Sequence, residues 1–162
     1  MSPIKGLHHV TISTPDLDRA LNFYCGLLGF TEMRRLSWDD AGEDVNRVLG
    51  LPASAAETVM LRAGNIVLEL FEFRVPTQAI ASEPPAHRYG YTHICLDVSD
   101  IETVYHRLVA AGIRFHAPPQ DFGDIKATYG RDPDGNIFEL QELIGDDHPI
   151  GLRSAGRLAA PA

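Results

Sequence analysis

Two histidines and two glutamates occupy repeated positions in the 162-residue sequence. His9 and His93 each open a short alternating run, and the second histidine follows the first by 84 residues. Glu69 and Glu139 each follow a Gly-Asn pair and an apolar run, and each directly precedes a leucine. Imidazole nitrogen and carboxylate oxygen together suit a divalent ion such as Mn, Fe, Co, Ni or Zn, and suit Mg less well. These four residues are therefore the predicted ligands of one metal ion.

Strand alternation predicts which way these side chains face. In residues 9–13, Val10 and Ile12 share one face, so His9 lies on the opposite face among small polar neighbours. The run that begins at His93 repeats this alternation. Burying an unpaired carboxylate costs on the order of several kcal/mol, so a mid-strand glutamate among apolar residues should face a cleft or a partner.

The segment after each histidine predicts a helix, because apolar residues recur there at helical spacing. Each half of the chain then continues with three strands, so we predict an internally duplicated α+β protein. Two strand–helix–strand–strand–strand copies would give an eight-stranded mixed sheet with helices outside and the histidines on its inner, curled face. The predicted parts are a first module at 1–75 with an insertion at 38–56, a connector at 76–90, a second module at 91–144, and a mobile or draped tail at 145–162.

The elements are expected at the following positions. The first module should have strands at 7–13, 30–37, 57–62 and 66–73, a helix from about 15 to 28, and a short helix at 43–49. The second should have a helix at 100–111, a short strand at 114–117, turns at 121–123 and 132–136, and strands at 126–131 and 137–143.

The starts of the two long helices carry capping signals. Thr14 can cap the first helix, with Pro15 at its first position. Ser99 and Glu102 have the spacing of a capping box at the start of the second helix.

Composition excludes several function classes. The formal net charge is −8 and no basic cluster stands out, which argues against a nucleic-acid partner. No apolar run is long enough to span a membrane, and the N-terminus carries no signal-like segment, so we expect a cytoplasmic protein. The two cysteines, Cys25 and Cys95, are expected to stay reduced and unpaired.

Four motifs in order carry a family resemblance. They are His9-Val-Thr-Ile-Ser-Thr-Pro-Asp-Leu17, Asn22-Phe-Tyr24 with Leu28-Gly-Phe30, Gly90-Tyr-Thr-His-Ile94, and Arg131-Asp-Pro-Asp-Gly-Asn-Ile-Phe-Glu-Leu140. Over roughly residues 5–144 the chain resembles the vicinal oxygen chelate superfamily, which includes glyoxalases, bleomycin resistance proteins and extradiol dioxygenases. The resemblance implies paired βαβββ modules that form a cup-shaped open barrel around one divalent metal. The family's ligand positions fall on His9, Glu69, His93 and Glu139.

Such a site suits a small substrate with two neighbouring oxygens. A metal can stabilise the charge that develops on a carbonyl oxygen when the adjacent carbon loses a proton, and a carboxylate can take that proton and return it. Glu139 or Glu69 is the expected base, with a preference for Glu139. Methylmalonyl-CoA epimerase and lactoylglutathione lyase are members that work this way, and the chain is similar to both. We therefore expect a metal-dependent isomerase or lyase, the epimerase-like group being the nearer.

Two alternatives stay open at this level. His9, His93 and Glu139 also form a 2-His-1-carboxylate set, which suits an Fe(II) extradiol dioxygenase with Tyr129 nearby, although Glu69 would fill a position that oxygen or the diol needs. The other alternative is a metal-free drug-binding protein. The presence of all four predicted metal ligands argues against it.

Other residues are given structural interpretations. His8 is expected at the surface, and Arg131 is expected to anchor a turn. Glu72 and Glu142 are expected to be solvated strand residues. Four aromatic residues could line the cup or belong to the ordinary core: Trp38, Phe71, Phe73 and Tyr129. Exposed sheet ends favour a homodimer.

Overall fold

The computed structural model describes residues 3–40, 42–78, 83–145 and 147–152. The chain forms two compact units, Met1–Ser82 and Glu83–Ala162. The boundary between them lies inside the connector predicted at 76–90. Within the described ranges, no helix is long and apolar enough to cross a membrane.

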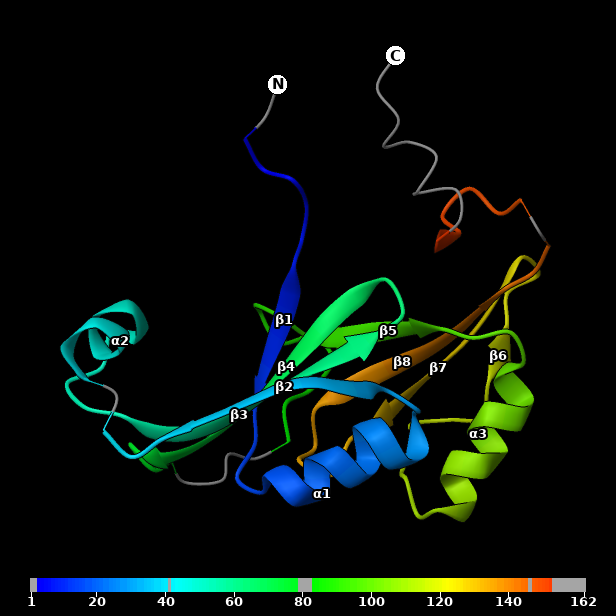
Figure 1. Ribbon diagram of the computed structural model, residues 1–162. Helices are drawn as coiled ribbons and strands as arrows, with labels where there is room; N and C mark the ends of the chain where they lie inside the picture. The colour runs from blue at the N-terminus through cyan, green and yellow to red at the C-terminus, as the bar shows by residue number, and fades with distance from the viewer. Residues whose placement is uncertain (1–2, 41, 79–82, 146, 153–162) are drawn as a thin grey trace. The chain divides into compact units, whose positions relative to one another are not determined.

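The first unit is a four-stranded mixed sheet with the strand order β1-β4-β3-β2 (Figure 1). The first strand pairs in parallel with the last, and the other pairs are antiparallel. The elements are β1 (His9–Ser13), α1 (Leu17–Leu21), the π-helix η1 (Asn22–Leu27), β2 (Thr31–Trp38), α2 (Gly42–Leu49), β3 (Ala55–Ala63) and β4 (Ile66–Val75).

The second unit repeats this plan with the strand order β5-β8-β7-β6. Its first strand again pairs in parallel with its last. The elements are β5 (His93–Asp97), α3 (Ile101–Ala110), β6 (Gln120–Asp121), β7 (Ile125–Arg131) and β8 (Ile137–Leu143). The predicted α+β class and the duplicated strand–helix–strand–strand–strand order are therefore confirmed, as two four-stranded mixed sheets. Their union into one cup stays a prediction.

Each unit buries its core between one helix and one face of its sheet. In the first unit, α1 packs on β4, where Leu68 and Leu70 are buried. In the second, α3 packs on β8, where Phe138 and Leu140 are buried. Side chains alternate along a strand, so a residue such as Glu69 lies on the opposite face, away from the helix.

Both helix starts differ from their predicted caps. The N-cap residues are Asp16 and Asp100, whose carboxylates accept hydrogen bonds from Arg19 N at 2.9 Å and Thr103 N at 3.0 Å. The predictions of Thr14 as a cap and of a capping box from Ser99 were therefore wrong. A carboxylate at the N-cap accepts a hydrogen bond from an N–H group that has no partner within the helix. It also interacts favourably with the helix dipole, which explains why aspartate occupies this position.

Two glutamates support the same helix starts from the neighbouring strands. Leu17 N donates to Glu72 Oε2 at 2.9 Å, and Ile101 N donates to Glu142 Oε2 at 3.1 Å. The interpretation of both glutamates as solvated was therefore wrong. Each lies on the helix-facing side of its strand and satisfies an N–H group that the helix itself cannot pair.

The edge of the second sheet also departs from expectation. The strand predicted at 114–117 is only an isolated bridge between Phe115 and Gly130. The short strand β6 was not predicted, and it leads into the predicted turn at 121–123, where Gly123 N donates to Asp121 Oδ1. Pro118 and Pro119 separate the two pieces, because proline has no N–H group to donate to the ladder.

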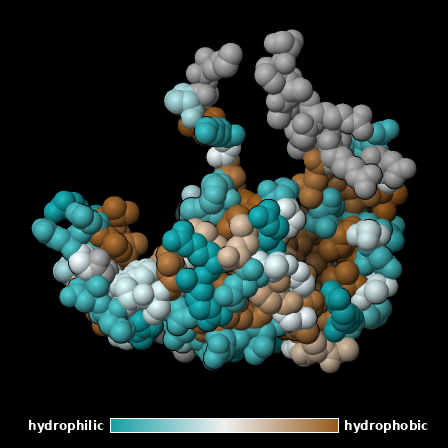
Figure 2. All heavy atoms as spheres, viewed as in Figure 1, coloured by the Kyte–Doolittle hydropathy of each residue, from teal (hydrophilic) through white to brown (hydrophobic). Residues whose placement is uncertain are grey.

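The remaining elements follow the sequence more closely. The insertion contains the expected short helix, α2, which extends from the end of the β2–β3 pair (Figure 1). None of its residues is fully buried, and Figure 2 shows apolar surface on it, where Val48 is 88% exposed. Arg131 anchors the turn before β8 as predicted, since its Nη1 donates to Gly135 O at 2.7 Å. Most of the predicted tail, at 146 and 153–162, lies outside the described residues.

Candidate metal centre

The first half of the candidate site is a histidine–glutamate pair on β1 and β4. The parallel register places Thr11 opposite Glu69, so the side chains of His9, Thr11 and Glu69 share the face away from α1. His9 Nε2 lies 3.5 Å from Glu69 Oε2. The structure thus brings together the two ligands that the sequence predicts in the first module.

Threonine hydroxyls anchor both carboxylate oxygens of Glu69. Thr11 Oγ1 donates to Oε2 at 3.1 Å, and Thr58 Oγ1 donates to Oε1 at 3.0 Å. The glutamate is only 8% exposed. Two donors of fixed position hold this buried carboxylate in one orientation, with Oε2 toward the imidazole.

The second unit repeats the pair on β5 and β8. His93 Nε2 lies 3.2 Å from Glu139 Oε2. The other ring nitrogen of His93, Nδ1, forms a 2.9 Å hydrogen bond with Thr92 Oγ1, which leaves Nε2 directed at the carboxylate. The ring of Tyr129 lies beside the imidazole, with 4.9 Å between centroids. The two ligands predicted in the second module therefore also come together.

The surroundings of Glu139 differ from those of Glu69 at both anchoring positions. Cys95 stands opposite Glu139 where Thr11 stands opposite Glu69. Ala127, paired two residues further along β8, takes the position that Thr58 has on β3. Glu139 consequently lacks the two hydroxyl donors that fix its counterpart.

The thiol and the phenol beside Glu139 stay protonated at neutral pH. Desolvation, the nearby charge of Glu139 and a hydrogen bond to its carboxylate raise the pKa of the Cys95 thiol to about 12. Desolvation and the same carboxylate also raise the pKa of the Tyr129 phenol. Glu139 is thus bordered by a neutral thiol and a neutral ring, and Cys95 is no activated nucleophile. Both cysteines are free, as predicted.

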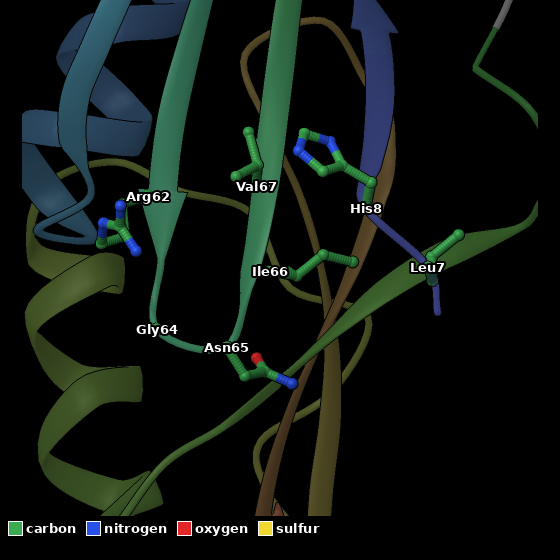
Figure 3. A pocket seen from close by; sticks show the side chains of 7 residues that line it. All are labelled: Leu7, His8, Arg62, Gly64, Asn65, Ile66 and Val67. Atoms are coloured by element: carbon green, nitrogen blue, oxygen red, sulfur yellow. The ribbon is translucent and has the colours of Figure 1, made fainter. Parts of the chain in front are cut away.

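A shallow hollow of about 250 Å³ lies at the open end of the first sheet, beside the β3–β4 turn (Figure 3). The side chain of His8 borders it, and the ring is exposed as predicted, with its Nδ1 2.9 Å from His9 Nδ1. Neither His9 nor Glu69 lines this hollow, so it is not the candidate metal centre. The full lining is Leu7, His8, Arg62, Gly64, Asn65, Ile66 and Val67.

The chemistry of each pair fits a divalent cation. Two ligands held at about 2.1 Å from one ion lie about 3.0 to 3.4 Å apart, close to the two nitrogen–oxygen distances measured in the pairs. Within the described ranges, no group of three or more His, Cys, Asp or Glu side chains gathers as a ligand cluster. Each unit by itself therefore contributes one imidazole and one carboxylate.

Sequence reasoning missed the two hydroxyl anchors of Glu69. Thr11 carried a usable signal, because it follows His9 by two residues and so shares its strand face. Thr58 carried none, because its proximity to Glu69 depends on the register between β3 and β4.

Comparison with known proteins places this geometry in a family. A model described as Glyoxalase/Bleomycin resistance protein/Dioxygenase superfamily matches residues 6–140. A 2-epi-5-epi-valiolone epimerase from Actinomyces sp. is 34% identical over 121 residues, which cover 73% of this chain and 66%, just under two thirds, of that protein. The mitochondrial methylmalonyl-CoA epimerase of Dictyostelium discoideum is 27% identical, with 86% of this chain and 79% of that protein covered.

A solved structure agrees with the sequence relatives. The crystal structure of a glyoxalase family protein from Bacillus cereus has a TM-score of 0.79 at 26% identity and covers 89% of this chain and 97% of its own. Lactoylglutathione lyases are also among the sequence relatives, so these relatives include enzymes of more than one activity. The chain belongs to the glyoxalase/bleomycin resistance protein/dioxygenase superfamily.

Proposed function

We propose that the protein is a divalent-metal-dependent isomerase or lyase that moves a proton at the carbon next to a chelated carbonyl, with epimerisation as the leading candidate. The ligands in this proposal are His9, Glu69, His93 and Glu139. The observation that carries it is the repeated histidine–glutamate pair, of which one carboxylate is anchored by hydroxyls and the other is not.

The cation, when bound, would stabilise the negative charge that develops on a substrate oxygen as the adjacent carbon loses its proton. The chain's own residues orient the ligands. The contact between Thr92 and Nδ1 of His93 leaves the other ring nitrogen free to ligate. The hydroxyls of Thr11 and Thr58 hold Glu69 in place, so in the proposal Glu69 is a fixed ligand.

Glu139 is the proposed general base. A base must leave its resting contact, accept a proton on a carboxylate oxygen, and deliver that proton back to carbon. Hydrogen bonds from two hydroxyls stabilise the charged form of a carboxylate and oppose this cycle, and Glu139 is free of them. In place of the hydroxyls it has a thiol, whose S–H group is a weaker donor, and a phenol that stays protonated.

Epimerisation is favoured over the lyase reaction by the relatives. The match at 34% identity is to a protein named as an epimerase, and a second epimerase matches over 86% of the chain. Both reactions use the same proton transfer, so the proposed roles of the four residues do not depend on this choice.

The extradiol dioxygenase is the weaker alternative. Tyr129 does lie beside His93, where a tyrosine could contact a diol. The threonine anchors count against it, because they fix Glu69 as a fourth ligand and leave fewer positions for oxygen and substrate. The metal-free drug-binding protein is disfavoured because such a function would not require two matched imidazole–carboxylate pairs.

Deuterium wash-in tests the proposal. The protein loaded with Mn²⁺, Co²⁺ or Ni²⁺ would be incubated in D₂O with a panel of acyl thioesters and α-keto acid adducts, and exchange at the α-carbon followed by mass spectrometry. Glu139→Gln should lower the exchange rate about 10²- to 10⁴-fold, the usual contribution of a general base. Because Glu139 is also a proposed ligand, the assay would use saturating metal, and elemental analysis would verify that this variant still holds one ion per chain.

Glu69→Gln is the matched control for that substitution. It changes a carboxylate of the same type at the equivalent strand position, and it should lower metal affinity as well as exchange. Equal exchange rates in wild type and Glu139→Gln would remove Glu139 from the role of base. Oxygen uptake with catechols on the iron-loaded protein would favour the dioxygenase instead.

A further inference from the structure

Three aromatic rings form a contiguous cluster on the first sheet, named here the aromatic wall: Trp38, Phe71 and Phe73. The two phenylalanine rings stack with 5.2 Å between centroids and 13° between planes. The indole meets Phe71 edge-on, with 6.0 Å between centroids. All three side chains are only half-buried, whereas Phe23 in the helix-covered core is 2% exposed.

The wall lies on the same sheet face as Glu69. Phe71 and Phe73 follow Glu69 by two and four residues on β4, which places them about 7 and 13 Å further along the strand. Trp38 pairs with Ala56, and Ala56 pairs with Phe73, so the indole shares this face. The helix α1 packs on the opposite face, so it does not cover these rings.

The equivalent positions on β8 of the second unit carry no aromatic ring. Gln141 and Leu143 follow Glu139 by the same two and four residues on β8. A wall required merely to complete the fold would be expected in both copies, since both sheets have the same topology. The presence of rings at these strand positions in only one copy indicates a role in the chemistry that this sheet serves.

The insertion fixes the indole of the wall. Trp38 Nε1 donates to Ser54 Oγ at 3.1 Å, and Ser54 Oγ donates to Asn46 Oδ1 at 2.7 Å. Ser54 is 3% exposed and Asn46 belongs to α2. The side chain of Arg74 also donates to Trp38 O at 2.9 Å. A surface tryptophan needs none of these contacts, whereas a ring that must present one face to a ligand does.

We propose that the aromatic wall binds a flat apolar group of the substrate, attached close to the oxygens that chelate the metal. The preferred substrate class is then an aryl- or alkenyl-bearing α-oxygenated acid or thioester, in preference to one with only a methyl group. Trp38, Phe71 and Phe73 contact this group, and Ser54 and Asn46 act as positioning residues through the indole. The inference rests on the proposed function for the site of chelation.

A matched pair of ligands tests the wall, because lactate and 3-phenyllactate share one chelating head and differ by a phenyl ring. Trp38 is the only tryptophan in the chain, so its fluorescence reports directly on the wall. With the Mn²⁺-loaded protein, 3-phenyllactate should bind at least about tenfold more tightly than lactate in calorimetry, as expected for a ring stacked among aromatic side chains. It should also change the emission of Trp38, and lactate should not.

Variants separate the wall from the chelating head. Trp38→Ala and Phe71→Ala should each weaken 3-phenyllactate about tenfold and leave lactate unchanged, whereas Trp38→Phe, which keeps a ring, should lose less. Phe122→Ala removes a ring that is 70% exposed in the other unit and serves as the control without effect. Asn46→Ala should shift Trp38 emission and weaken 3-phenyllactate a few-fold, and Asn46→Asp, which keeps the acceptor oxygen, should restore both.

The outcomes distinguish the inference from the proposed function. If lactate binds in a metal-dependent way and the phenyl ring adds no affinity, the wall is wrong and the proposed function stands. If 3-phenyllactate changes Trp38 emission without any dependence on metal and lactate fails to bind, the wall stands and the metal-based function is wrong. If neither acid binds, both are overturned.

Discussion

Glu69 and Glu139 occupy equivalent positions in two copies of one fold, yet they have different neighbours. Each lies in the last strand of its unit, and each has an imidazole nitrogen within 3.5 Å. Glu69 accepts hydrogen bonds from Thr11 and Thr58, while cysteine and alanine stand at those positions around Glu139. In the proposed function, these two differences separate Glu69, the fixed ligand, from Glu139, the general base.

The scaffold of the two copies has not diverged in the same way. Aspartate caps the helix in both, and a strand glutamate accepts from the first helical N–H in both. The two copies therefore share the contacts that hold each helix start on its sheet. They differ in the contacts made by Glu69 and Glu139. The substitutions below test this division, beginning with the largest expected effect.

Thr58→Val should weaken metal binding about 10- to 100-fold, the usual effect of removing a partner that orients a ligand. It should also lower the free energy of unfolding by about 1 to 3 kcal/mol, because a buried carboxylate oxygen loses its donor. Metal titration and urea unfolding would measure the two effects. Thr128→Val is the control. That threonine is buried to a similar degree, but its hydroxyl donates to Ala117 O and not to a carboxylate of either ligand pair. Equal metal affinity in both variants would contradict the anchoring role.

The double variant Cys95→Thr with Ala127→Thr should give Glu139 the hydroxyl donors of its counterpart. Two new donors favour the charged carboxylate, so the rate of deuterium exchange should fall about tenfold while metal affinity is kept. Cys95→Val with Ala127→Val has nearly the same side-chain volume and no donor, so it is the matched control. An equal loss of rate in the two double variants would assign the effect to crowding alone.

Glu72→Ala and Glu142→Ala should have nearly equal effects, because the two residues make the same contact in the two units. Each should lower the free energy of unfolding by about 1 kcal/mol, as the loss of a capping interaction does. Chemical unfolding with metal present would measure this. Metal affinity should not change, and a large difference between the two variants would show that the scaffold has diverged as well.

Asp100 gives the smallest expected effect, visible as a dependence on pH. Hydrogen bonds from the Thr103 hydroxyl and backbone N–H lower the pKa of this carboxyl below its ordinary value. A lowered folded-state pKa adds stability above the ordinary value, near pH 4, and that stability is lost as the pH falls through the lowered pKa. Asp100→Asn should therefore show a smaller drop in melting temperature than wild type between pH 5 and pH 2.5, measured by circular dichroism. An identical drop would exclude this contribution.

The repeated features of the chain could be predicted from sequence because they follow from local periodicity. The alternation after His9 and His93 gave the strands, and the Asp132–Asn136 turn fixed the start of the last strand at Ile137. The pairing of each histidine with a glutamate followed from placing both on the same strand face.

Other features depended on contacts between segments distant in sequence. Thr58 reaches Glu69 only through the register of β3 against β4, and Glu72 reaches α1 only because the helix lies across that strand. Neither contact could therefore be predicted from a single sequence. The helix caps were missed for a local reason, since Thr14 and Ser99 are also good capping residues and stand within two residues of Asp16 and Asp100, which occupy the N-cap positions.

The parallel pairing of β1 with β4 has a consequence for biosynthesis. His9 cannot find Val67 until nearly the whole first unit has left the ribosome, so the earliest strand made must wait for the latest. Once Val75 has emerged, that unit has every strand it needs, while the strands of the second unit have not yet left the ribosome. The duplicated halves can thus mature one after the other, each closing on itself before the next supplies a competing edge.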